Sequence, residues 1–114
     1  MSGIAADLPP VDNEGFLLEP SDWSETIATT IAQQFDAELS ADHWAIVNFV
    51  RDYYEYHQQV PETRRVLQWM KTAEEFGKER ATRKGLYKLF PHGYGQQACK
   101  IAGMRKPLKL MLDV

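Results

Sequence analysis

The sequence predicts a mainly α-helical protein, an orthogonal, helix-turn-helix-like bundle of about five helices with a small N-terminal β-hairpin and a flexible C-terminal arm. Two observations predict it. Apolar residues recur every three or four positions between residues 23 and 90, the period of amphipathic helices. Ser, Pro and Gly residues divide these stretches where helices begin and end. Because 114 residues suffice for one core, we expect a single domain, with a globular body over residues 11–103 and an arm over residues 104–114.

The first ordered element should be the hairpin, after a loose lead-in that ends at Pro9-Pro10. Val11 and the run Phe16-Leu17-Leu18 are apolar, and the turn-forming residues Asp12-Asn13-Glu14-Gly15 separate them. Turn residues between two short apolar pieces are typical of a hairpin. An isolated hairpin is only marginally stable, so we expect this one to pack on the helices.

Two helices are expected next. The first should start at Ser21 or Asp22, because Asp22 and Glu25 have the spacing of a capping box. The second should start at Ser40, a favourable N-cap residue, and end at Val60, because the residue before a proline is disfavoured in the α conformation. This second helix is the most apolar and should form the centre of the core through Trp44, Val47, Phe49, Val50, Tyr53 and Tyr54.

The second half of the chain predicts shorter helical stretches. Pro61 suits the first turn of a helix that Gly77 should end. Residues 78–88 form a basic stretch, from which Leu86 and then Leu89 and Phe90 should enter the core before Pro91 closes it. A last short helix should run from Gln96 to Ala102 with Gly103 as its cap.

Charge is distributed unevenly along the chain. Residues 1–62 hold twelve acidic residues and one cation, Arg51, whereas residues 63–114 hold twelve cations and four acidic residues. The halves therefore carry −11 and +8, and the net charge is −3. This asymmetry indicates either a basic binding face or two halves that attract each other across the fold. We favour the second interpretation, because compact helical domains mix charge in this way on their surfaces.

Composition also indicates a compartment. No apolar run approaches the ~20 residues that cross a bilayer, and the first residues lack the basic and apolar regions of a signal peptide. The single cysteine cannot form an internal disulfide. We therefore expect a cytoplasmic protein in a reducing environment.

Cys99 is the candidate catalytic residue. The cations Lys100, Arg105 and Lys106 follow it, and nearby positive charge favours the thiolate, which is the reactive form. Gly93, Gly95 and Gly103 leave the backbone around it adaptable. We expect the three cations to contribute to binding. The alternative is that Cys99 is a small buried apolar residue.

The sequence gives only weak signals for metal binding and for nucleic acid binding. His43, His57 and His92 lie far apart, and none has the spacing of a metal site, so we expect no metal and no cofactor. The run Tyr53-Tyr54-x-Tyr56 should point around a helix and not along one face. The basic stretch at 78–88 could bind a nucleic acid backbone, but acidic neighbours weaken this interpretation, and a nucleic acid partner stays an alternative that we do not favour.

Several segments carry a resemblance when they are taken together in order. The strongest is Gln97-Ala98-Cys99-Lys100-Ile101-Ala102-Gly103 with Lys106-Pro107. The others are Asp12-Asn13-Glu14-Gly15-Phe16-Leu17, Pro20-Ser21-Asp22-Trp23, Ile27-Ala28, His43-Trp44, Phe49-Val50-Arg51-Asp52-Tyr53-Tyr54 and Leu89-Phe90-Pro91-x-Gly93. From about Asp12 to Pro107 the chain resembles the DsrC/TusE family of small sulfur-relay proteins, which includes the gamma protein of dissimilatory sulfite reductase.

The resemblance implies a small helical bundle with an N-terminal hairpin and a flexible arm. In that family the arm carries a penultimate cysteine, eleven positions after the one that matches Cys99, which receives sulfur as a persulfide and passes it on. In TusE-type members the sulfur feeds thiolation of a tRNA wobble uridine, and in DsrC-type members both cysteines act and the arm enters the sulfite reductase. The implied partners are sulfur-relay proteins or a sulfite reductase-like complex.

The sequence departs from the family at the sulfur carrier. Leu110 lies eleven positions after Cys99, and the penultimate residue is Asp113. A two-cysteine cycle therefore cannot occur within this chain. One hypothesis is a sulfur-relay protein that handles sulfur as a persulfide on Cys99, and whether it is an enzyme, a sulfurtransferase-like carrier, stays open. The alternatives are a non-catalytic regulatory or binding paralogue and a helix-turn-helix-like nucleic-acid-binding protein.

Overall fold

The computed structural model describes residues 8–74 and 76–106. The elements follow in the order η2, a 3₁₀ turn (Pro20–Asp22), α1 (Glu25–Gln33), α2 (Ala41–His57), α3 (Thr63–Thr72), α4 (Gly77–Arg80), α5 (Arg83–Leu89), η3, a π-helical turn (Tyr94–Ala98), and α6 (Cys99–Ile101). The predicted helical bundle is confirmed. None of the helices among these residues is long and apolar enough to cross a bilayer.

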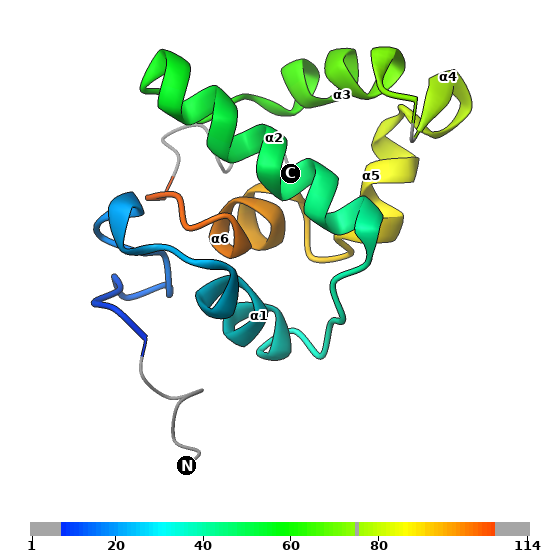
Figure 1. The fold of residues 1–114 in the computed structure, drawn as a ribbon. Coiled ribbons are helices and arrows are strands. Elements are labelled where there is room, and N and C mark those ends of the chain that lie inside the picture. Colours follow the sequence, from blue (N-terminus) through cyan, green and yellow to red (C-terminus); the bar gives the residue numbers. More distant parts are fainter. Residues whose placement is uncertain (1–7, 75, 107–114) are drawn as a thin grey trace.

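Helix α2 runs through the middle of the molecule, with α6 and α1 on one side and α3 on the other (Figure 1). Ile46, Val47 and Val50 of α2 are fully buried, and Trp44, Phe49 and Tyr54 pack against the core in part. The expectation that this helix forms the centre of the core is confirmed, except that Tyr53 is not among the residues that pack there. Helices α3, α4 and α5 then follow one another around one edge (Figure 1).

The predicted β-hairpin is wrong. Among the described residues, the N-terminal segment forms only one isolated antiparallel bridge, between Val11 and Leu17. The Oδ1 atom of Asp12 accepts the backbone N–H groups of Glu14 (2.8 Å) and Phe16 (3.0 Å), and Gly15 adopts φ +94°. Phe16 and Leu17 are then both buried, whereas strand residues alternate between two faces. The segment is a side-chain-stabilised turn.

The start of the first helix is also corrected. Pro20–Asp22 form the 3₁₀ turn η2, Trp23 is extended, and α1 begins after Ser24, whose Oγ accepts the N–H of Ile27. The predicted start of α2 is confirmed: Ser40 is its N-cap and forms a capping box with His43. Helix α2 ends at His57, where Gln58 takes the left-handed conformation, and not at Val60.

In the second half, the expected stop at Gly77 is wrong, because α3 ends at Thr72 and Gly77 begins α4 with φ +70°. Leu86 and Phe90 enter the core as predicted. The last helical segment starts at Tyr94, two residues before the expected Gln96, and turns out of the helix at Gly103 with φ +76°. Met104 is fully buried. Residues 107–114 of the expected flexible arm lie outside the described residues.

Candidate functional site

Cys99 lies at the junction of η3 and α6. Its backbone N–H donates to the carbonyl of Tyr94, five residues earlier, which is the π-helical pattern. The side chain has an exposed fraction of 0%, and its neighbours Ala98, Ile101 and Ala102 are equally buried. The only thiol of the chain therefore lies inside the hydrophobic core and not on the surface.

Lys100 lies beside the N-terminal turn. Its Nζ atom is 4.9 Å from the ring centroid of Phe16 and 5.5 Å from that of Phe35. A cation over an aromatic face is attracted by the electrons of the ring. The same amine lies 3.5 Å from the position that a Cβ on Gly15 would occupy. Lys100 thus joins α6 to the turn at residues 12–16.

Lys106 reaches the same turn from the base of the expected arm, and its Nζ forms an ion pair with Glu14. Both side chains are about 40% exposed, so the pair contributes little to stability and is screened by salt. Arg105 is exposed. The structure therefore brings Lys100 and Lys106 to the N-terminal turn, and the charged groups of both are engaged there.

Asp12 organises that turn electrostatically. Burial raises the pKa of its carboxyl, but backbone hydrogen bonds from Phe16, Glu14 and Gly15 and the charge of Lys106 outweigh burial, so that the pKa lies below the usual 3.8. Hydrogen bonds to the charged form of a carboxyl favour that form. The carboxylate is therefore the state that holds the turn.

A cluster that sequence reasoning did not single out holds the end of α6. The guanidinium of Arg51 donates to the carbonyls of Ala102 (2.8 Å) and Pro20 (3.2 Å). It also lies over the Trp23 ring, whose Nε1–H donates to the carbonyl of Ile101 (2.8 Å). We call these residues the Trp23–Arg51 cluster. One signal could have found it, since Arg51 is the only cation of residues 1–62.

Burial lowers the pKa of Arg51 below its usual value, and the nearby Glu55, Asp52 and Tyr54 raise it in part. An arginine stays charged at neutral pH in this situation. The guanidinium therefore serves as a permanent donor that satisfies two carbonyls at once.

The three histidines occupy separate places. His43 accepts from the Ser40 backbone N–H through Nδ1 (3.1 Å), and its Nε2 lies 2.8 Å from the carbonyl of Leu89. His57 lies among tyrosines at the end of α2, and His92 lies beside Phe35. In residues 8–74 and 76–106, no three His, Cys, Asp or Glu side chains gather in a way that could hold a metal ion.

Comparison with known proteins identifies the fold. The family model described as "DsrC like protein" matches residues 4–111. The sulfurtransferase TusE of Escherichia coli (strain K12) is 45% identical over 98 residues, which cover 86% of this chain and 88% of that protein. The TusE of Shigella dysenteriae has the same identity and coverage.

Solved structures agree. The NMR structure of Allochromatium vinosum DsrC is 42% identical and has a TM-score of 0.75, with 85% of each chain covered. The oxidized gamma-subunit of the dissimilatory sulfite reductase from Archaeoglobus fulgidus is 31% identical with a TM-score of 0.78, covering 87% of this chain and 89% of that one. A chain in the crystal structure of dissimilatory sulfite reductase I is 34% identical, with a TM-score of 0.69 and 86% of each chain covered. This chain belongs to the DsrC-like family of sulfur-relay proteins.

Proposed function

We propose that this chain is a binding member of a sulfur relay, whose folded body docks onto a relay partner without carrying sulfur on a terminal cysteine. The observation that carries the proposal is the complete burial of Cys99, the only cysteine of the chain. A sulfur carrier must present its thiolate to the persulfide of a donor. In this fold no thiol is presented at the surface.

The body of the family is nevertheless retained. The structure follows two solved relatives with TM-scores of 0.75 and 0.78, and the Trp23–Arg51 cluster orders the chain as far as the base of the arm. A protein that has the family's helical fold but a buried cysteine can bind at a partner's docking site without transferring sulfur.

The partner in this proposal is a sulfur-relay protein or a sulfite reductase-like complex. The support comes from relatives, because one similar protein is a sulfurtransferase and another is the gamma-subunit of a dissimilatory sulfite reductase. Lys100, Arg105 and Lys106 are the proposed binding cations: Lys100 is part of α6, and the exposed Arg105 and Lys106 follow where the chain leaves that helix. A cytoplasmic location is part of the proposal, because a cysteine that forms no disulfide is kept as a thiol in a reducing compartment.

Calorimetric titration of the full chain into a relay sulfurtransferase and into a sulfite reductase complex tests this role. We expect the wild type and Cys99→Ala to bind one of them with affinities that agree within about twofold, because the buried thiol does not touch the partner. Arg105→Glu should weaken binding, because it reverses a charge at the docking surface. Failure of both partners to bind, or loss of binding in a folded Cys99→Ala variant, would contradict the proposal.

A second candidate function is sulfur transfer on Cys99 itself. One observation favours it: the cysteine follows a π-helical turn, a distortion that is frequent at functional sites. Gly93 and Gly103, both with positive φ, bound the segment that would open. The exposed thiolate would attack the outer sulfur of a donor persulfide, forming a Cys99 Sγ–S bond and releasing the donor as a thiolate.

Mass spectrometry distinguishes the two functions. The chain is incubated with a persulfide donor, and its mass is compared with that of Cys99→Ser treated identically. The binding role predicts no added sulfur atom on the folded wild type, and alkylation of Cys99 only after denaturant is added. Addition of one sulfur that Cys99→Ser lacks would establish the carrier function instead.

A further inference from the structure

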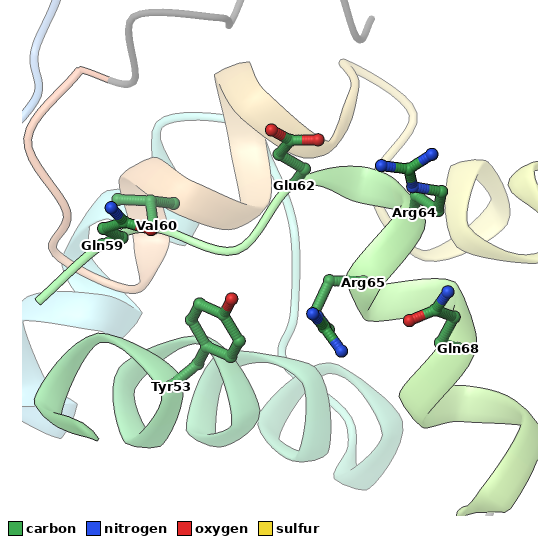
Figure 2. A pocket seen from close by; sticks show the side chains of 7 residues that line it. All are labelled: Tyr53, Gln59, Val60, Glu62, Arg64, Arg65 and Gln68. Atoms are coloured by element: carbon green, nitrogen blue, oxygen red, sulfur yellow. The ribbon is translucent and has the colours of Figure 1, made fainter. Parts of the chain in front are cut away.

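A polar pocket lies between the end of α2 and the start of α3. Its volume is about 310 Å³, and it is lined by Tyr53, Gln59, Val60, Glu62, Arg64, Arg65 and Gln68. In Figure 2, Tyr53 stands on α2 and faces Arg65, and Gln68 lies beside Arg65 on α3. We call it the α2–α3 pocket. None of the proposed docking cations Lys100, Arg105 and Lys106 lines it, so it is separate from the proposed docking surface.

Two neighbouring arginines supply its charge. Arg64 and Arg65 are both exposed, and neither forms an ion pair within the part of the chain that the structure describes. A guanidinium presents a planar fork of donors that matches the oxygens of a phosphate. The pocket therefore offers donors for an oxyanion that the fold itself does not use.

A row of aromatic rings leads to these arginines along the last turns of α2. The ring centroids of Tyr56 and His57 are 4.9 Å apart, and those of His57 and Tyr53 are 4.2 Å apart. The guanidinium carbon of Arg65 then lies 5.9 Å from the Tyr53 ring. Tyr56 is 85% exposed. The solvent-accessible aromatic rings therefore lie next to the arginines of the α2–α3 pocket.

Rings and arginines in this order match one kind of ligand. Exposed aromatic rings stack on nucleic acid bases, and arginines contact the phosphates that join them. The side-chain amides of Gln59 and Gln68 can both donate and accept hydrogen bonds at a base edge. We propose that the α2–α3 pocket and its aromatic row bind a single-stranded nucleic acid, with a base on Tyr56 and His57 and a phosphate at Arg64 and Arg65.

An acidic peptide fits this surface less well. It would engage the arginines but leave the aromatic row unused. The carboxylate of Glu62 also lines the pocket and lowers its net positive charge. A second pocket of about 340 Å³ at α4 and α5 also has one carboxylate, that of Glu79, but it holds more cations, Arg80, Lys84 and Lys88, and no aromatic ring. Binding driven by charge alone would favour that second pocket, and it therefore serves as the matched control.

Fluorescence anisotropy of a labelled mixed-sequence RNA of about ten nucleotides, titrated with the full chain at low salt, tests the proposal. We expect Arg65→Gln and Tyr56→Ser each to weaken binding about tenfold, because each removes one phosphate or stacking contact. Lys84→Gln, in the control pocket, should change it by less than about twofold. Arg65 and Tyr56 are both exposed, so the variants should fold, and circular dichroism checks this. Amide NMR shifts on binding should concentrate at the end of α2 and the start of α3.

Three results would each overturn the proposal. The wild type could fail to bind the strand at low salt. Lys84→Gln could weaken binding as much as Arg65→Gln, which would show general attraction to positive charge. A peptide of glutamates could displace the strand at equal concentration, which would make the site one for acidic protein segments.

Discussion

The guanidinium carbon of Arg51 lies 4.2 Å from the centroid of the Trp23 ring, and both side chains donate hydrogen bonds to backbone carbonyls at the end of α6. Arg51 comes from α2, and Trp23 precedes α1. Three segments that are far apart in the sequence therefore meet where the chain leaves α6. The cluster holds the carbonyls of Ile101 and Ala102, the two residues before Gly103.

Replacing Arg51 should test how much the cluster contributes. Arg51→Met leaves the carbonyl of Ala102 without the donor that Arg51 supplies, while the carbonyl of Pro20 keeps the backbone N–H of Trp23. It also removes the cation from the Trp23 ring, and we expect a loss of about 3 kcal/mol in the free energy of unfolding. Urea unfolding measures it. Arg64→Met, on the surface of α3, is the control and should cost less than about 0.5 kcal/mol. Equal costs for the two variants would mean that the cluster does not stabilise the fold.

Two glycines with positive φ allow a matched comparison. A Cβ on Gly103 would lie 2.3 Å from Cδ1 of Trp23, whereas a Cβ on Gly77 would meet nothing within 4 Å. Gly77→Ala should therefore cost only the left-handed backbone, about 1 kcal/mol. Gly103→Ala should cost at least about twice as much and should shift the tryptophan fluorescence, because Trp23 must move. The comparison fails if the two variants unfold at the same urea concentration.

The lowered pKa of Asp12 should make the free energy of unfolding depend on pH. Its pKa is lowered in the folded state, so its contribution is present above the unfolded value of 3.8 and is lost as the pH falls through the lower folded pKa. At neutral pH, Asp12→Ala should lower the free energy of unfolding by about 1 kcal/mol. The difference between wild type and variant should shrink below pH 3.8, as measured by urea unfolding across pH. A difference that stays constant to lower pH would exclude the carboxylate as its source.

The corner between α4 and α5 depends on Gly85. A Cβ at this position would lie 2.1 Å from the carbonyl oxygen of Arg80, and backbone atoms cannot move aside as a flexible side chain can. Gly85→Ala should destabilise the chain by about 2 kcal/mol and speed amide hydrogen exchange in α4 and α5. Lys84→Ala, one residue earlier and exposed, should leave exchange there unchanged. Unchanged exchange in Gly85→Ala as well would show that the corner can open to admit a methyl group.

Capping residues and apolar spacing predicted helix positions correctly where only a few neighbouring residues determine them. Ser40 caps α2 as expected, and Leu86 and Phe90 enter the core at their expected positions. The N-terminal segment failed because the side chain of Asp12 accepts the backbone N–H groups of Glu14 and Phe16, so the Phe16 N–H does not pair across two strands. The start of α1 failed because Trp23 is extended and bonds to Ile101, 78 residues away, and a capping pattern read over four residues cannot include that contact.

By itself, the sequence determined the helical class, the family resemblance and the lack of a cysteine at Leu110 and Asp113, because these depend on residue identity and spacing along the chain. Only the tertiary structure decided that Cys99 is buried in the core, that Lys100 and Lys106 meet the turn at residues 12–16, and that Arg51 holds the end of α6. The physical reason is that burial and long-range hydrogen bonds depend on which surfaces meet when the helices pack. In the sequence alone, the cations Lys100, Arg105 and Lys106 are compatible with a reactive thiol at the surface. The packing of the helices instead places the Cys99 thiol where solvent does not reach it.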